Sequence, residues 1–173
     1  MLVKRLLIVL PVALVLFALV PTAARAAPGV PYTIHGVDQN TFEDVGICSP
    51  SATITLDARF VVHVNATEAG LTDQEILDAL FNGDPEGIFR SVTYTETGTF
   101  TDVESTGQVI TGTFTMWFGG NINGHTMEFG DTFNVRGVDQ DGNHITAHDN
   151  GHITLVNGEP VVDFEHLSSR GCP

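Results

Sequence analysis

Three histidines, His144, His148 and His152, are spaced by four residues within the segment 144–156. On a helix this spacing would place the imidazoles on one stripe, an arrangement that can chelate a transition metal. The segment is instead rich in Ile and Thr and is flanked by turn residues, so we expect a strand. Residues four apart in a strand share a face but lie about 13 Å apart, too far to bind one zinc ion.

A tight turn at Asn150-Gly151 would also bring no two of these histidines together. A metal site would therefore need further ligands from adjacent strands, such as Glu128, Asp131 or His166. We predict no metal site and no cofactor.

If the histidine segment is a strand, its alternate side chains lie on the same face, and those of one face form a polar row. The row contains Thr146, His148, Asn150, His152 and Thr154. If this face lines a barrel interior, it can hydrogen-bond a ligand, whereas a solvent-facing row is ordinary surface. Both orientations stay open, and His148, Asn150 and His152 are candidate ligand-binding residues.

Asp131 is a further candidate, because it interrupts an apolar alternation that runs from Met127 to Val135. A carboxylate in a pocket can have a raised pKa and act as an acid or base. Asp131 with His148 or His152 is therefore the candidate catalytic group of a cyclase-type or isomerase-type enzyme. Because Gly-x-Ser-x-Gly, His-Glu-x-x-His and phosphate-loop motifs are absent from the sequence, we favour a non-enzymatic protein.

Trp117 and Phe118 precede Gly119-Gly120, which we interpret as turn residues after a strand. An aromatic pair there either contacts a ligand at a barrel mouth or packs in the core, and Trp117 joins the candidate ligand-binding residues. The run Asp139 to Asn143 superficially resembles a calcium loop. Asn150 stands where a bidentate Glu is needed, so we predict a β-turn.

Residues 1–26 have the features of a cleaved Sec-type signal peptide. Lys4 and Arg5 precede an apolar run over 6–20, and small residues lead up to Ala26. The run is short for a membrane span, so a retained anchor is the lesser alternative. Cleavage would leave 27–173 as a single domain that is secreted to the extracellular space.

The chain has a net charge of −14 at pH 7. Such a charge repels nucleic acid and anionic lipid, so we expect neither nucleic acid nor membrane partners after signal cleavage. A small-molecule ligand or a basic protein is the expected partner.

The two cysteines, Cys48 and Cys172, are expected to form a disulfide in an oxidising compartment. On the loop-entropy model this bond contributes up to about 4–5 kcal/mol of stability.

One helix and a series of strands are predicted. Thr72 to Glu75 forms a capping box for a short helix over Thr72–Asn82, with an apolar stripe of Ile76, Leu77, Leu80 and Phe81. Strands are predicted at about 52–65, 89–102, 106–118, 127–135, 144–156 and 160–166, with a possible start at 32–35 and a long loop over 36–50. The fold class is therefore mostly β: a single antiparallel β-barrel or strongly curled meander sheet, with a two-sheet sandwich as the alternative.

Several features occur together in the segment from Phe89 to Cys172. They are Trp117-Phe118-Gly119-Gly120-Asn121, Phe133-Asn134-Val135-Arg136-Gly137, His148, His152 and the terminal cysteine. In these the chain resembles small, uncharacterised secreted β-barrel proteins of bacteria. Its expected architecture is also similar to lipocalin and allene-oxide-cyclase barrels, although the Gly-x-Trp motif of lipocalins is missing. The resemblance implies a barrel and no activity.

The sequence thus favours a secreted, non-enzymatic β-barrel that binds a small molecule or a partner at one barrel mouth. The alternatives are the barrel enzyme described above and an acidic exported interaction or inhibitor protein.

Overall fold

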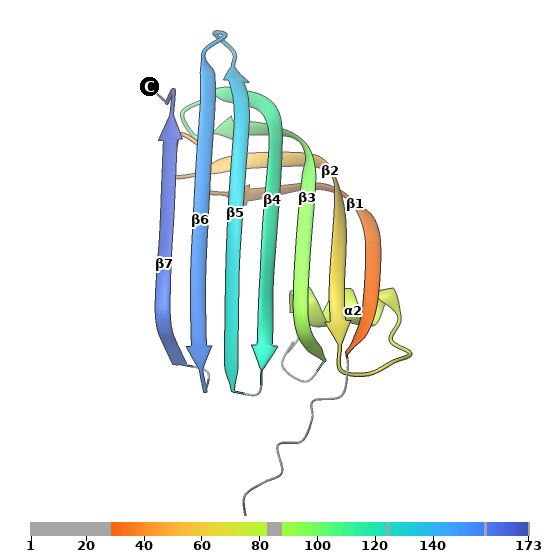
Figure 1. Cartoon of the computed structure of the whole chain (residues 1–173). Helices are drawn as coiled ribbons and strands as arrows, with labels where there is room; N and C mark the ends of the chain where they lie inside the picture. Colours follow the sequence, from red (N-terminus) through yellow and green to blue (C-terminus); the bar gives the residue numbers. More distant parts are fainter. Residues whose placement is uncertain (1–28, 83–87, 124, 158, 173) are drawn as a thin grey trace, which may run out of the picture.

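A computed structural model describes residues 29–82, 88–123, 125–157 and 159–172. The predicted signal peptide, residues 1–26, lies outside the described residues. The described chain forms one seven-stranded antiparallel sheet in which each strand pairs with its sequence neighbours (Figure 1). The strands are β1 (Val30–Asp44), β2 (Ala52–Ala66), β3 (Phe89–Glu104), β4 (Val109–Asn123), β5 (Thr126–Asp139), β6 (His144–Val156) and β7 (Glu159–Arg170).

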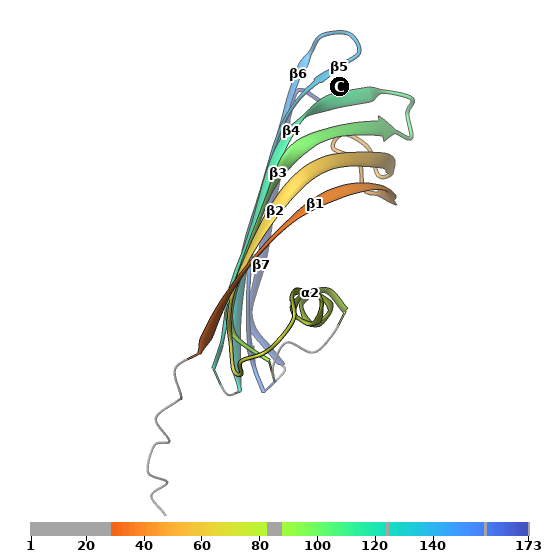
Figure 2. The same ribbon diagram turned by 90° about the vertical axis from the view of Figure 1, so that its right-hand side faces the viewer.

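The predicted mostly β meander is confirmed, in its curled form. Figure 2 shows the sheet bent along its length, with the helix α2 (Asp73–Asn82) on the concave side, which we call the trough. Among the described residues, β1 pairs only with β2 and β7 only with β6, so no ladder closes the sheet into a barrel there.

The alternation predicted for β2 is also confirmed. Ala58, Val62 and Val64 are buried toward the trough, whereas Asp57, Arg59 and His63 are exposed on the convex face. Because successive side chains of a strand point to opposite faces, the pairing registers assign every strand position to the trough or to the convex face.

The long loop predicted over 36–50 is wrong, because β1 continues to Asp44 and pairs with β2 as far as Asp44 opposite Ala52. Its polar composition is tolerated because β1 is an edge strand with one solvated side. Gly36 is required by packing: a Cβ there would lie 2.1 Å from the ring of Phe60. Only residues 45–51 connect β1 to β2, and we call this loop the strap.

The helix is confirmed, and so is its capping box. The backbone amide of Thr72 donates to Glu75 Oε2 at 2.8 Å, and the amide of Glu75 donates to Thr72 Oγ1 at 3.3 Å. Ile76 and Ala79 pack against the sheet, whereas Phe81 of the predicted apolar stripe is largely exposed and meets Tyr94 edge-on. Among the described residues, no helix has the length and apolarity to cross a membrane.

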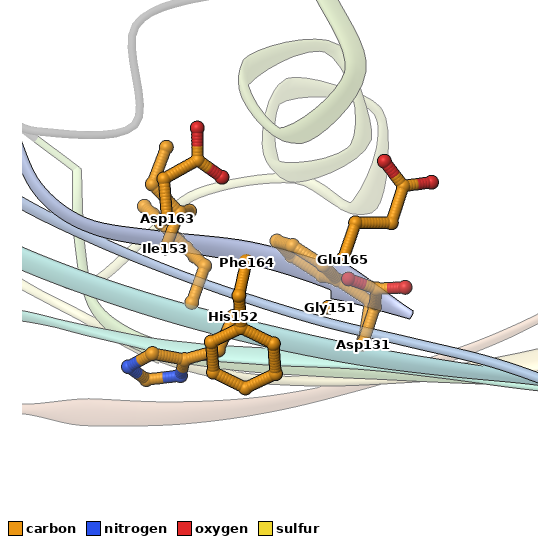
Figure 3. Close-up of a pocket in the computed structure, with 9 residues that line it drawn as sticks. Asp131, Gly151, His152, Ile153, Asp163, Phe164 and Glu165 are labelled. Atoms are coloured by element: carbon orange, nitrogen blue, oxygen red, sulfur yellow. The ribbon is translucent and has the colours of Figure 1, made fainter. Parts of the chain in front are cut away.

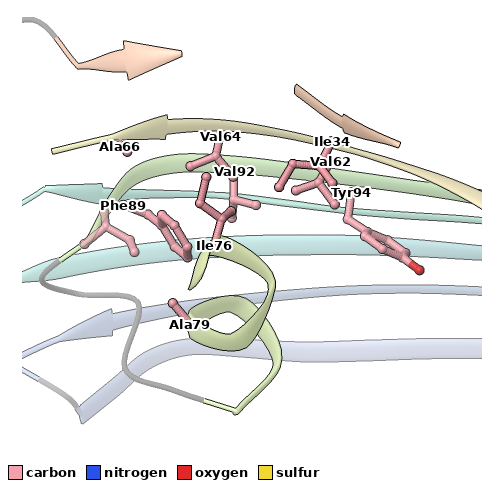
Figure 4. Packing of buried hydrophobic residues seen from close by; sticks show 10 residues of the cluster. Ile34, Val62, Val64, Ala66, Ile76, Ala79, Phe89, Val92 and Tyr94 are labelled. Carbon is pink, nitrogen blue, oxygen red and sulfur yellow. The ribbon is translucent and has the colours of Figure 1, made fainter. Parts of the chain in front are cut away.

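The trough is filled at its two ends by separate apolar clusters. The helix-end cluster places Ile76 and Ala79 of α2 against buried residues of β1, β2 and β3 (Figure 4), and it includes Ile34, Val62, Val64, Phe89 and Val92. The disulfide-end cluster lies below the strap and contains Ala58, Phe100, Ile110, Phe114, Val135, Ile145 and Ala147.

The predicted disulfide is confirmed. Cys48 in the strap is bonded to Cys172 after β7, across a sequence separation of 124, and their Cα atoms are 5.3 Å apart. The first and last parts of the sheet are thus joined covalently over the disulfide-end cluster, although no ladder joins β1 to β7 in the described residues.

Candidate functional site

The residues proposed from the sequence do not form one site. In the β5–β6 register, Asp131 is opposite Gly151, whereas Asn134 is opposite His148 and Gly130 is opposite His152. Asp131 therefore belongs to the trough face and the two histidines to the convex face. Figure 3 shows this directly, with the Asp131 carboxylate on the side of α2 and the His152 ring on the other side of the sheet.

The polar row of β6, with His148, Asn150 and His152, lies on the convex face. Nδ1 of His148 hydrogen-bonds the side-chain oxygen of Asn134 at 2.8 Å, and His148 is exposed. Nε2 of His152 lies 3.1 Å from Thr154 Oγ1, and its ring stacks on Phe164 at a centroid distance of 5.8 Å. The turn at Asn150-Gly151 does not form, because β6 is continuous from His144 to Val156.

No group of three or more His, Cys, Asp or Glu side chains that could hold a metal ion occurs in the part of the chain that the structure describes. The run Asp139 to Asn143 forms the predicted turn. Asp139 Oδ1 accepts hydrogen bonds from the amides of Asp141 at 2.9 Å and Asn143 at 2.8 Å. The hydrogen bonds that the side chain and backbone of Asn143 donate to Asp139 hold the pKa of Asp139 below its ordinary value. The same hydrogen bonds stabilise the turn.

Trp117 also lies on the convex face, but in the middle of β4. The prediction that Gly119-Gly120 forms a turn is wrong, because β4 continues to Asn123. The Trp117 ring lies over Gly119, where a side chain would obstruct it, and it also approaches Gly130. Trp117 and His152 share a shallow, open hollow of about 470 Å³. The structure thus brings Trp117 and His152 together. His152 and Asp131 also line one small hollow of about 230 Å³, but their side chains lie on opposite sides of the sheet.

A more enclosed cavity of about 340 Å³ lies in the trough, between the strap and the sheet, and we call it the trough cavity. Its walls are mainly apolar side chains from β2 to β5: Ile54, Leu56, Phe100, Phe114, Phe133 and Val135. Four carboxylates also line it: Asp44, Asp102, Asp149 and Glu165. An apolar cavity with a few polar groups is the usual form of a small-molecule site.

Buried carboxylates hold the strap in place over this cavity. Asp102 is 0% exposed, and its Oδ2 accepts a hydrogen bond from the amide of Ile47 at 3.0 Å. Glu104 Oε1 accepts from the amide of Cys48 at 2.7 Å, and the hydroxyl of Ser49 donates to Oε2. The strap is therefore fixed by side chains of β3 as well as by the disulfide.

Two carboxylate oxygens at the cavity are buried without hydrogen bonds from the described residues. They are Oδ1 of Asp102 and Oδ1 of Asp149. Burial raises the pKa of Asp102 above its ordinary value, the amide of Ile47 acts in the opposite direction, and Glu104 raises the pKa further. The described residues that line the cavity thus include four carboxylates and no arginine or histidine that could pair with them.

The predicted residue Asp131 extends this acidic region along the trough. Burial raises the pKa of its carboxyl above the ordinary value, and the charge of Asp149 raises it further. Its Oδ1 lies over Gly151, where a Cβ would be 2.5 Å away. Asp131 lines a smaller hollow of about 230 Å³ next to the trough cavity, and Glu165 lines both.

The Asp102→Asn variant is expected to have a higher free energy of unfolding than the native protein at about pH 7. The raised pKa means that the folded state binds the Asp102 proton more tightly than the unfolded state does, so the stability due to this group falls as pH rises through the folded pKa. The advantage of the variant should disappear below about pH 3.5, where the acid is protonated in both states. Urea denaturation at the two pH values measures this difference.

The matched control is Asp57→Asn, because Asp57 is exposed on the convex face and accepts a hydrogen bond from Gln39 that asparagine can still accept. It should change stability little at either pH. An Asp102→Asn variant less stable than the native protein at neutral pH would contradict the assignment of a buried, electrostatically unfavourable carboxylate.

Comparison of the chain with models of protein families, with curated proteins and with solved structures gave no match.

Proposed function

We propose that this protein binds a small, largely apolar molecule in the trough cavity. The observation that carries the proposal is the cavity itself: a space of about 340 Å³ between apolar side chains of the sheet and a covalently fixed strap. Burying an apolar ligand there removes apolar surface from water on both partners. The concave side of the curled sheet would then hold the ligand that we expected in the interior of a barrel.

Preorganisation of the cavity supports binding at this place. The strap is anchored by the Cys48–Cys172 bond and by the carboxylates of Asp102 and Glu104, so little order has to be gained when a ligand enters. The convex hollow next to Trp117 is shallow and open to solvent, which favours it less as a ligand site.

Binding is favoured over the cyclase or isomerase alternative by the placement of the candidate catalytic residues. Asp131 faces the trough, whereas His148 and His152 face outward (Figure 3). An acid and a base must both reach the reacting atoms of one substrate, and residues on opposite faces of a sheet do not.

We also propose that the protein acts after export, as the predicted signal peptide implies. The disulfide supports this proposal weakly, since such bonds persist mainly in oxidising compartments.

A fluorescence titration tests the binding proposal. N-phenylnaphthylamine is a neutral probe whose emission rises in apolar surroundings, and we expect it to bind the native protein saturably. Ala147→Phe would place a ring in the cavity, because Ala147 is buried and lines it, and this variant should lose probe binding. Thr146→Phe is the matched control, since it adds the same ring at the next residue, on the convex face, and should bind normally.

Circular dichroism shows whether each variant is folded. If Ala147→Phe does not fold, Leu56→Trp fills the same cavity from β2, where the side chain of Leu56 is only partly buried. The proposal is wrong if the native protein does not bind the probe, or if folded cavity-filling variants bind it as well as Thr146→Phe does.

A further inference from the structure

The charges around the trough cavity are all of one sign. Asp44, Asp102, Asp149 and Glu165 line it, and no arginine or histidine is among the described residues of its lining. Three of the arginines, Arg59, Arg136 and Arg170, belong to convex-face positions of their strands. The cavity is therefore a place of strong negative potential within apolar walls, where an opposite charge is attracted more strongly than in water.

Acidic residues gathered on a surface are common, but Asp102 is different, because its side chain is fully buried. One of its oxygens is occupied by the amide of Ile47, and Oδ1 accepts no hydrogen bond from the described residues. Asp149, which also lines the cavity, is only partly buried, but its Oδ1 is a buried atom that likewise accepts no hydrogen bond from the described residues. A buried oxygen without a donor costs free energy, which a ligand with N–H donors would recover.

The form of the cavity selects between kinds of cation. A metal ion requires several oxygen ligands at short distances, and no suitable group of three acidic or histidine side chains occurs in the described residues. The walls are instead formed by Phe100, Phe114 and Phe133 together with aliphatic side chains. Apolar contacts suit a carbon skeleton, and aromatic faces attract an organic cation.

We infer that the ligand of the trough cavity is an organic cation, with an ammonium or amidinium group near Asp102 and an apolar body against the phenylalanines. This inference rests on the proposed binding function and specifies its ligand class. The cationic group donates a hydrogen bond to Oδ1 of Asp102, the charge of Asp149 attracts it from another part of the cavity lining, and the apolar body displaces water from the walls.

Displacement of N-phenylnaphthylamine by three ligands of equal length tests the inference. Octylammonium, octanol and octanoate differ only in the head group. Octylammonium should displace the probe at about tenfold lower concentration than octanol, because a hydrogen bond to a charged group is stronger than one between neutral groups. Octanoate should bind more weakly than octanol because of repulsion by the carboxylates.

The variants Asp102→Asn and Asp149→Asn show whether these carboxylates cause the preference. Each should reduce the preference for octylammonium over octanol, measured as the ratio of the two displacing concentrations, several-fold. Asp57→Asn removes the same charge from the convex face, and it controls for the general attraction between an acidic protein and any cation.

The outcomes separate the two proposals. Equal displacement by the three ligands, or a preference that persists in both cavity variants or falls equally in Asp57→Asn, would overturn the cationic ligand while leaving apolar binding intact. Displacement by calcium chloride but not by sodium chloride at equal ionic strength would overturn it in favour of a metal ion. Failure of the native protein to bind the neutral probe would overturn the proposed function itself.

Discussion

Replacement of both cysteines, Cys48→Ser with Cys172→Ser, is expected to lower the free energy of unfolding by up to about 4–5 kcal/mol. The bond closes a loop with a sequence separation of 124, so its loss frees much conformational entropy in the unfolded chain. The folded state also loses the covalent connection between the strap and the end of β7. Urea denaturation of the native protein and the double variant measures the difference.

The double variant should also bind N-phenylnaphthylamine more weakly, because the strap forms one wall of the trough cavity. Reduction of the native protein should reproduce both effects, and a reductant should not affect the double variant, which has no thiol. The hydrogen bonds from the strap to Asp102 and Glu104 remain in the variant, so partial binding is expected. Stability equal to that of the native protein would show that the disulfide contributes little to the fold.

The sequence predicted the regular parts of this fold for physical reasons. The capping box of Thr72 and Glu75 determines the start of α2 through local hydrogen bonds, which need no tertiary information. The alternation in β2 reflects a sheet with one buried face, and the structure has that face. The disulfide followed from the presence of only two cysteines.

The errors occurred where tertiary packing overrides local preference. Gly36 and Gly119 resemble turn residues, but each lies inside a strand. An aromatic ring occupies the space that a side chain would take at each position, Phe60 over Gly36 and Trp117 over Gly119. The polar residues of β1 form a strand because β2 provides a hydrogen-bonding partner along its whole length. Such contacts join residues far apart in sequence, so local patterns do not contain them.

The site was predicted only in part for a related reason. Alternation grouped His148, Asn150 and His152 correctly on one face of β6, but it did not determine which face is concave. Asp102 was not identified from the sequence. Asp102 follows Phe100 by two residues in β3, and this spacing could have indicated that its carboxylate lies on the same buried face as Phe100. Its importance depends on the strap, whose position over β3 is a tertiary property.

A second large effect on stability is expected from Phe89→Ala at the opposite end of the trough. Phe89 is 1% exposed and belongs to the cluster that joins β3 to Ile76 and Ala79 of α2 (Figure 4). Truncation removes a buried ring and leaves a cavity, so the free energy of unfolding should fall by about 3–5 kcal/mol. Urea denaturation monitored by circular dichroism measures the change.

Phe164→Ala makes the same chemical change on the convex face, where the ring is 53% exposed and stacks on His152. It should cost about 1 kcal/mol or less, since little apolar surface becomes newly exposed. Equal losses in the two variants would contradict the division into a buried trough and a solvated convex face. Folded Phe89→Ala should still bind the neutral probe with near-native affinity, because the trough cavity lies at the disulfide end of the trough. Binding would then depend on the disulfide end of the trough, whereas the packing of Phe89 at the helix end contributes to stability without forming part of the ligand site.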